Sequence, residues 1–260
     1  MNLTDRRVVI TGAGRDFGRA LAHHFAGLGA ELFLAARSLE AAERTRDEIR
    51  DRATGHGRAH DDDGARDRVH AFACDLADPA SIREFAAAVG RRTDRIDVLV
   101  NNGARWLAGP DLLSVSDEDV ADTLASGSTG TILATKNFLP LLLASDRPDV
   151  VTMVSVCGVP GAQHPVAHEA YFAAKHGQRG FTEALSRRLR PQGVRVISLF
   201  PPDFDSGRDP LSPEWDATPR GAQDPLAAQS VIDCITFAIQ QPRDCYISAF
   251  HFESLHPSAS

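Results

Sequence analysis

A phenol and an ammonium group four positions apart are the side chains whose spacing points most clearly to chemistry. Tyr171 and Lys175 stand at i and i+4 in Tyr171-Phe-Ala-Ala-Lys175, which places both on one face of a helix. The chain has only two tyrosines and two lysines. A chance pair at this spacing has a probability of about 1–2%. Nearly all other basic residues of the chain are arginines. A lysine at position 175 therefore indicates a role that needs a compact ammonium group rather than a guanidinium group.

The chemistry that this pair predicts is proton transfer to or from an oxygen. A free tyrosine titrates at about pH 10. A neighbouring ammonium and a nicotinamide cation would favour the phenolate and lower that pKa. Tyr171 would then give a proton to a carbonyl oxygen as hydride arrives, or accept one in the reverse direction. Ser155, at the end of a predicted strand, would hydrogen-bond the same oxygen, although a serine there can also simply cap a turn.

A glycine-rich turn near the start of the chain predicts a phosphate site. The run Gly12-Ala-Gly-Arg-Asp-Phe-Gly18 joins a strand to a helix, and such a turn lets a pyrophosphate approach the helix amino end. The next strand ends in Ala35-Ala36-Arg37-Ser38, without the acid that holds the ribose in NAD sites. Arg37, helped by Arg15, would hold a 2′-phosphate, so we expect NADPH to be preferred over NADH.

Strands and helices alternate along the chain, which predicts a Rossmann-like doubly wound parallel α/β sheet of about seven strands in a single domain, 1–260. Sites in such sheets lie at the carboxyl ends of the strands. The expected strands are 7–11, 31–36, 69–74, 97–100, 150–155, 194–200 and 245–250. The expected helices are 19–29, 40–52, 79–90, 117–143 with a kink at Gly127 or Gly130, 171–190 and 225–240. We expect loops at 54–68 and 201–225, the latter a mobile substrate loop.

Composition excludes several other classes of protein. A chain of 260 residues with a net charge of −7 gives no reason to expect nucleic acid or an anionic membrane as partner. No leader or membrane-length apolar run is apparent. The four cysteines lack metal-ligand spacing and are typical of buried thiols in a reducing cytoplasm. We therefore expect a cytoplasmic protein without a metal site that acts on a small molecule.

In their order along the chain these motifs resemble the short-chain dehydrogenase/reductase family, from Arg7 to about Phe250. The resemblance implies catalysis by Ser155, Tyr171 and Lys175, and a homodimer or homotetramer packed through helices at about 117–143 and 171–190. The cofactor contacts that it implies are Gly12, Gly14, Arg15, Asp16, Phe17, Gly18, Arg37, Ser38, Asp75, Leu76, Asn102, Gly103, Tyr171, Lys175, Pro201, Phe204 and Ser206.

Four positions depart from the pattern of that family. Asp16 replaces the middle glycine of the turn, which puts a carboxylate near the expected pyrophosphate unless it points away or pairs with Arg15 or Arg19. The family motif NNAG appears as Asn101-Asn102-Gly103-Ala104, and Pro202 replaces a glycine. The helix asparagine that supports a water beside the lysine is replaced by Gly127; Ser126 or Ser128 would have to hold that water.

The residues that would contact the substrate are less clearly indicated by the sequence. Trp106, Gly158 and Trp215 would line an apolar wall, although either tryptophan could instead belong to the core. His164 or His168 would contact substrate or merely be solvated, and Pro202 stiffens the same region.

The main hypothesis is an NADPH-dependent reductase that converts a ketone into a secondary alcohol, or the reverse, in specialised metabolism. Two alternatives stay open. One is a non-redox enzyme of the same fold, such as an epimerase or dehydratase. The other is a catalytically weak protein that senses the cofactor.

Overall fold

Seven parallel strands form one sheet in the computed structural model, which describes residues 2–4, 6–55, 68–205, 207, 209–212, 215, 221 and 224–253. The strands lie in the order β3-β2-β1-β4-β5-β6-β9. Their bounds are β1 Arg7–Thr11, β2 Glu31–Ala36, β3 Val69–Ala73, β4 Val98–Asn101, β5 Asp149–Met153, β6 Arg195–Phe200 and β9 Ala249–His251. The chain therefore has the predicted doubly wound architecture, with the strand order reversing between β1 and β4.

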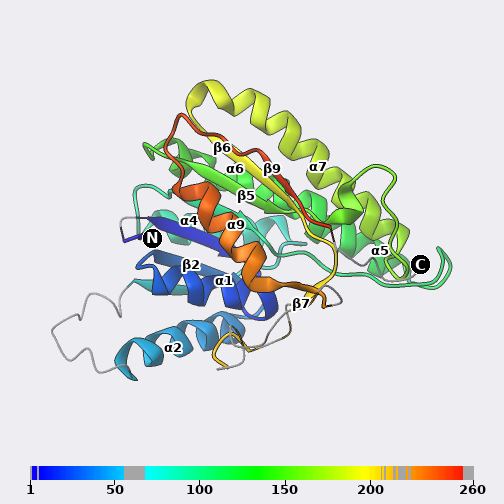
Figure 1. Ribbon diagram of the computed structural model, residues 1–260, viewed down its shortest axis with the longest axis horizontal. Coiled ribbons are helices and arrows are strands. Elements are labelled where there is room, and N and C mark those ends of the chain that lie inside the picture. Colours follow the sequence, from blue (N-terminus) through cyan, green and yellow to red (C-terminus); the bar gives the residue numbers. More distant parts are fainter. Residues whose placement is uncertain are drawn as a thin grey trace.

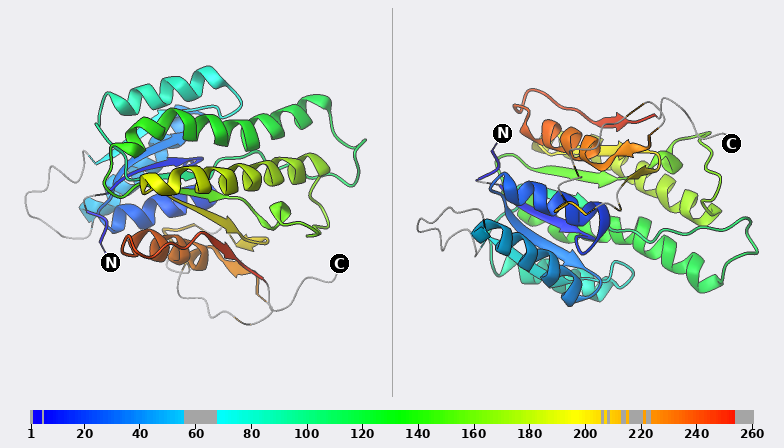
Figure 2. Two further views of the ribbon diagram at one scale, coloured as in Figure 1. Left: turned by 90° about the horizontal axis from the view of Figure 1, so that it is seen from above. Right: turned by 60° about the horizontal axis from the view of Figure 1, so that its bottom comes forward.

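Helices cover both faces of this sheet (Figures 1 and 2). One layer holds α1 (Asp16–Gly27), α2 (Leu39–Gly55) and α9 (Ala228–Gln240). The other holds α4 (Pro79–Gly90), α5 (Asp117–Leu124), α6 (Gly130–Leu143) and α7 (Glu169–Leu189). Successive strand residues point to opposite faces, so Val8 and Ile10 pack toward α1 and α9, whereas Val9 packs toward α4 and α6.

Several boundaries differ from the sequence prediction. Helix α1 begins at Asp16, three residues before the predicted start, because the glycine turn closes tightly on the helix. The predicted loop at 201–225 contains β7 (Phe204–Asp205), which pairs with β8 (Leu226–Ala227) in a small two-stranded sheet. This pairing was missed because two-residue strands leave no periodic pattern. Residues 56–67 of the other predicted loop lie outside the described residues.

The predicted kink in the long helix takes the form of one π-helical turn, η1 (Ala125–Thr129), between α5 and α6. Ser126 Oγ donates to the Asp122 carbonyl and Thr131 Oγ1 donates to the Gly127 carbonyl. Such bonds back to the preceding turn compete with the helical ladder, and Gly127 adds little helix propensity. The bulge lies against α7.

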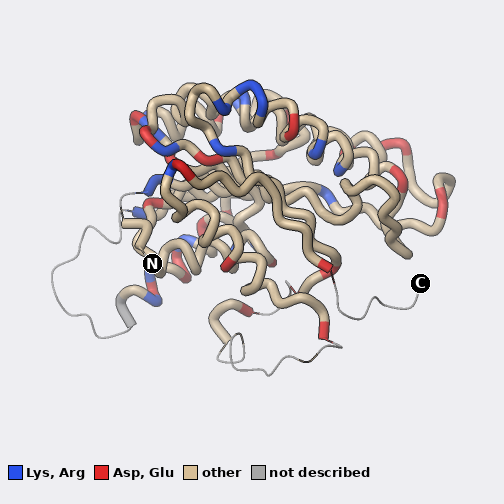
Figure 3. The backbone as a smooth tube through the Cα atoms, turned by 45° about the horizontal axis from the view of Figure 1, so that its top comes forward, with Lys and Arg blue, Asp and Glu red and all other residues tan. Residues whose placement is uncertain are grey.

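Charges of both signs are interspersed along the backbone (Figure 3). In the part of the chain that the structure describes, no helix combines the length and apolarity needed to cross a membrane.

A buried ionic cluster ties together the amino ends of two strands. Asp149 and Arg195, the first residues of β5 and β6, are register partners and form a two-pronged ion pair at 2.8 and 2.9 Å. Arg243 adds a third bond to the same carboxylate at 2.7 Å. Arg195 also donates to the carbonyls of Ile239 and Cys245. The Asp149 and Arg195 side chains are 0% and 5% exposed, so this pair is shielded from water, whereas Arg243 is partly exposed.

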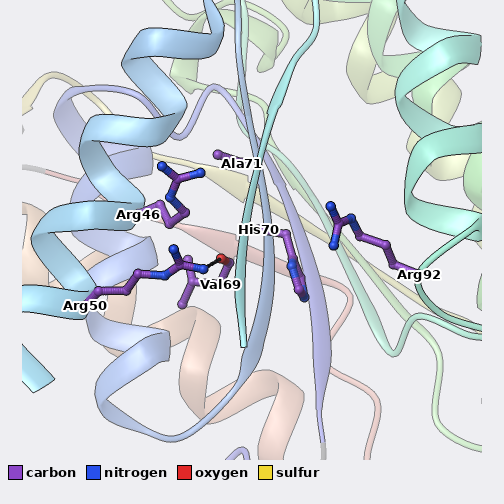
Figure 4. A pocket seen from close by; sticks show the side chains of 6 residues that line it. All are labelled: Arg46, Arg50, Val69, His70, Ala71 and Arg92. Carbon is purple, nitrogen blue, oxygen red and sulfur yellow. Dashed lines mark hydrogen bonds between the residues drawn. The ribbon is translucent and has the colours of Figure 1, made fainter. Parts of the chain in front are cut away.

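The outer edge of the sheet at β3 is bordered by a basic hollow of about 390 Å³ (Figure 4). Arg46 and Arg50 reach it from α2, and His70 and Arg92 lie on the other side of the strand. Each has a structural partner: Arg50 donates to the Val69 carbonyl at 3.1 Å, Arg46 pairs with Asp47, His70 contacts Glu31, and Arg92 lies over the Phe72 ring. These bonds explain the basic side chains as supports of an edge strand.

Candidate active site at the carboxyl ends of the strands

Ser155, Tyr171 and Lys175 come together where β5 ends. Ser155 follows β5 and precedes η2 (Val156–Gly158), while Tyr171 and Lys175 lie in the first turns of α7. Ser155 has a φ of +117°, a conformation that a non-glycine residue adopts only at a cost. Its Oγ accepts from the Cys157 amide at 3.2 Å and also hydrogen-bonds the Tyr171 phenol. The serine thus caps a turn and faces the phenol as well.

Protein groups alone keep the Tyr171 phenol protonated. Burial raises its pKa, the electrostatic influence of Cys157 and of Asp203 acts in the same direction, and the hydrogen bond with Ser155 opposes them. The expectation that Lys175 lowers this pKa is therefore not met by the protein alone, since burial outweighs the other influences. A protonated phenol is the form that can donate a proton.

Lys175 is nearly inaccessible, at 4% exposed. Its Nζ donates to the Met153 carbonyl at 2.9 Å and to Gln178 Oε1 at 3.0 Å, and lies 5.4 Å from the centre of the Tyr171 ring. Burial lowers the Lys175 pKa to about 7. The Lys175 amino group can therefore change between ammonium and neutral amine near neutral pH.

The glycine turn is braced by the loop after β4. Thr11 Oγ1 accepts from the amides of Asn102 and Gly103, both at 3.1 Å. The Asn102 side chain donates to the Thr11 and Gly12 carbonyls. A Cβ on Gly12 would lie only 2.7 Å from Gly103 Cα, so the two loops can approach this closely only with glycine there. Asn102 and Gly103 therefore support the turn from beneath.

Asp16 adopts the left-handed conformation that usually selects glycine, with φ of +47°. Its side chain is 54% exposed and its Oδ2 lies 3.5 Å from Arg15 Nε. Arg19 is not its partner, because Arg19 binds Glu48 at 2.7 Å and Asp209 at 3.0 Å. Of the options that the sequence left open, the structure shows a loose pair with Arg15 at the surface.

The residues predicted for the adenosine end lie on neighbouring loops. Arg37 is exposed and forms no ion pair with any described residue, and Ser38 Oγ accepts from the Ala41 amide at the start of α2. Asp75 caps its own turn through the Ala77 amide, and the Leu76 side chain lies against Gly103. A neighbouring hollow of about 360 Å³ is lined by Gly14, Arg15, Asp16, Arg19, Arg44, Glu48, Gly207 and Asp209.

The other predicted cofactor contacts lie in the glycine turn and after β6. Phe17 is buried and meets Phe204 edge-on, with ring centres 5.2 Å apart. The Pro201 carbonyl accepts from the Val156 amide at 2.8 Å, which ties the end of β6 to η2. Gly18 packs against Gly12. Ser206 lies outside the described residues.

An aromatic side chain borders the phenol on the substrate side. Trp106 is 46% exposed and meets the Tyr171 ring edge-on at 4.6 Å and the His164 ring at 5.4 Å. His164 Nε2 contacts Asp203 Oδ2 at 3.1 Å, and its Nδ1 accepts from the Ala167 amide. His164 thus links the loop after η2 to the loop after β6, and its ring nitrogens are already engaged.

Four other residues were predicted for the substrate side. Trp215 packs against the core on the α9 side and donates to Gln229 at 2.8 Å, which favours its reading as a core residue. A Cβ on Gly158 would lie 2.9 Å from the Lys175 carbonyl, so this glycine lets η2 pack on α7. His168 is buried and caps α7 through the Ala170 amide. Pro202 is half-buried beside Asp203.

Neither serine of the bulge faces Lys175. Ser126 bonds the Asp122 carbonyl, and Ser128 bonds the Ala174 carbonyl at 2.8 Å. Instead the buried Gln178 connects Lys175 to Gly127. Gln178 and Arg44 were not among the predicted residues. Gln178 could have been found from its position three residues after Lys175, on the same helix face, whereas nothing in the sequence singles out Arg44.

Known proteins are similar to this chain in sequence. A family model described as short chain dehydrogenase matches residues 6–216. A Streptomyces violaceoruber protein described as ketoacyl reductase 1 of a granaticin polyketide synthase is 35% identical over 74% of this chain and 65% of its own length. The D-threitol dehydrogenase of Mycolicibacterium smegmatis is 31% identical over 76% of this chain and 70% of its own. The chain thus spans about two thirds of these relatives.

A solved structure agrees over nearly the whole chain. A metagenomic short-chain oxidoreductase in complex with NADP is 25% identical, has a TM-score of 0.73 and covers 96% of either chain. The family model reaches from β1 beyond β7 and spans the glycine turn, Ser155, Tyr171 and Lys175. With its parallel sheet reversing at β1 and this cluster at the strand ends, the chain belongs to the short-chain dehydrogenase/reductase family of oxidoreductases.

Proposed function

We propose that this protein is an NADPH-dependent reductase that converts a ketone into a secondary alcohol. The observation that carries the proposal is the placement of the Tyr171 phenol between Ser155 and Lys175, where burial raises its pKa and favours the protonated form. A phenol in this form is ready to protonate an oxygen, as reduction of a carbonyl requires. Two of the relatives, from Streptomyces species, are described as ketoacyl reductases, which supports a ketoacyl compound as substrate.

Each of the three residues has a role in this reaction. Bound NADPH would supply the hydride. The Ser155 hydroxyl donates a hydrogen bond to the substrate oxygen and orients the carbonyl. Tyr171 gives its proton to that oxygen as negative charge develops on it. Lys175 places a positive charge beside the phenol and stabilises the phenolate that remains. Trp106 covers one side of the phenol ring and borders the substrate.

The turn after β1 fits a dinucleotide. Its glycines allow close approach of a pyrophosphate to the amino end of α1, and Asn102 fixes the turn. Arg37 and Arg44 are exposed arginines near the end of β2, with Arg15 on the neighbouring turn. Together they supply guanidinium groups for a 2′-phosphate. The protein would work as a homodimer or homotetramer through α5–α6 and α7, where Leu124 and Ile132 are exposed.

The first experiment is a titration of the purified protein with NADPH and with NADH, followed by nicotinamide fluorescence. A panel of ketones and ketoacyl thioesters then measures consumption of NADPH. Tight NADPH binding and turnover of a ketone are expected. Binding of neither nucleotide would reject the proposal, and binding without turnover of any carbonyl would favour the cofactor-sensing alternative.

Arg37→Ala should weaken the binding of NADPH much more than the binding of NADH. Loss of a charge-assisted bond to phosphate costs about 1.5–3 kcal/mol, so the Kd for NADPH should rise roughly 10- to 100-fold. The Kd for NADH, which lacks that phosphate, should stay within about twofold of the wild-type value. Arg83→Ala, at an exposed arginine on α4, is the matched control. Equal losses for both nucleotides would remove Arg37 from the 2′-phosphate site.

Substituting Asp16 should strengthen NADPH binding. A half-exposed carboxylate near the pyrophosphate repels it by about 0.5–1 kcal/mol, so Asp16→Asn should lower the Kd roughly two- to fivefold. Asn also tolerates the left-handed backbone, so this variant isolates the charge. Asp16→Gly removes the charge and the strain together, and a thermal melt separates the two effects. Unchanged affinity in both variants would show that the Asp16 carboxylate stays away from the cofactor.

A further inference from the structure

Gln178 is a buried amide placed between Lys175 and the bulge of the long helix. It is 1% exposed and lies three residues after Lys175 on α7. Its Oε1 accepts from Lys175 Nζ at 3.0 Å. Its Nε2 donates to the Gly127 carbonyl at 3.1 Å and to Thr131 Oγ1 at 2.8 Å. All the hydrogen atoms and one lone pair of this amide are therefore engaged in a fixed orientation.

Gly127 explains why the amide comes from α7. A Cβ at position 127 would lie 3.0 Å from the Ala174 Cβ, which is tighter than ordinary contact. An asparagine in the long helix would need this space, whereas a side chain that starts on α7 does not. Ser128, which bonds the Ala174 carbonyl, holds the bulge and α7 at this short separation.

We propose that Gln178 is a positioning residue that holds the Lys175 ammonium beside Tyr171 and takes the place of the helix asparagine that this chain lacks. This inference rests on the proposed function of Tyr171 and Lys175. The Lys175 ammonium has three N–H groups. The Met153 carbonyl and Gln178 Oε1 each accept a hydrogen bond from one of them, and the third N–H group remains for the active site. The bond from Nε2 to Gly127 extends this support into the bulge.

The test compares two substitutions with opposite electrostatic effects. Gln178→Leu keeps the size of the side chain and removes the acceptor, which should shift the titration midpoint of Lys175 downward. Gln178→Glu places a carboxylate beside the ammonium and should shift the midpoint upward by at least about one pH unit. The titratable groups that face Lys175 are Tyr171 on the same helix and Cys157 on η2, and both are retained in each variant.

Because the chain contains few lysines, the NMR signal of Lys175 can be followed on its own. The chain labelled with ¹⁵N-lysine contains only Lys136 and Lys175, and the exposed Lys136 serves as internal reference. The NMR titration of the full-length protein, with and without NADPH, follows the Lys175 Nζ itself. Shifts in opposite directions for the two variants support the proposal. A Lys175 midpoint that is the same in all folded variants, or that moves in one direction in both, overturns it.

Kinetics provide the second readout. Gln178→Leu should lower kcat between about 10- and 100-fold through a misplaced ammonium, with little change in KM. Gln240→Leu, which removes a half-buried amide on α9 whose Nε2 is shielded from water, is the control away from the site and should leave kcat unchanged. If the wild-type protein neither binds NADPH nor reduces a ketone, the proposed function fails, and the NMR titration still decides the role of Gln178.

Discussion

Tyr171→Phe should lower kcat by about 10²- to 10⁴-fold while NADPH affinity stays within about twofold of the wild-type value. The substitution removes a single oxygen and its proton. The ring that remains can keep its edge contact with Trp106 at 4.6 Å and its place above Lys175. This variant therefore separates cofactor binding from the chemical step. Consumption of NADPH with a ketone measures the change in kcat, and fluorescence titration measures the affinity for NADPH.

Tyr246 offers the matched control, since it is the other tyrosine of the chain. Its hydroxyl lies 2.7 Å from Ser186 Oγ and donates to the Val196 carbonyl at 2.8 Å, away from the candidate site. Tyr246→Phe should therefore retain kcat and lose about 1 kcal/mol of stability. If Tyr171→Phe turns over as fast as Tyr246→Phe, Tyr171 is not the proton donor.

Asp149→Asn should destabilise the fold by about 3–5 kcal/mol, because it leaves Arg195 buried without its countercharge. Arg195 is 4% exposed and cannot turn toward water while β6 stays paired with β5. In a domain of this size the loss corresponds to a fall in Tm of roughly 6–20 °C. Thermal and guanidinium unfolding followed by circular dichroism measure it.

A neighbouring carboxylate gives the comparison. Asp146 is 85% exposed and lies 3.7 Å from Arg147, three residues before Asp149. Because exposed pairs contribute little, Asp146→Asn should change stability by less than about 0.5 kcal/mol. Equal effects of the two substitutions would mean that the cluster of Asp149 and Arg195 does not stabilise the sheet.

The sequence predicted the seven main strands and a kink at Gly127 or Gly130, because apolar periodicity and glycine both act locally; the last strand, predicted at 245–250, is β9 at Ala249–His251. The features that it missed depend on contacts between distant residues. The pairing of Phe204 with Leu226 joins segments that are far apart along the chain. Trp106 and Trp215 look alike in sequence, and only the packing of Trp215 near Gln229 and the core assigns it a structural place.

In the candidate site, too, local spacing was predictable and contacts between distant residues were not. Tyr171 and Lys175 follow from helical spacing, but the bond from Gln178 to Gly127 spans 51 residues and needs the packing of α7 on the bulge. The left-handed backbone at Asp16 was not predicted, although Asp tolerates this conformation better than most residues and stands where the family turn has a glycine. His168 was read as a contact of uncertain use, since helix caps are usually serine, threonine, aspartate or asparagine, and yet it caps α7.

The bond from Arg50 to the Val69 carbonyl has a consequence for how copies of this protein can meet. An exposed edge strand is a template on which a second sheet can grow, and such growth leads to aggregation. At β3 a guanidinium from α2 occupies an outward carbonyl, and charged side chains flank the strand. Lateral extension of the sheet at this edge is thereby discouraged. Backbone pairing between two copies would therefore have to use the other edge strand, β9.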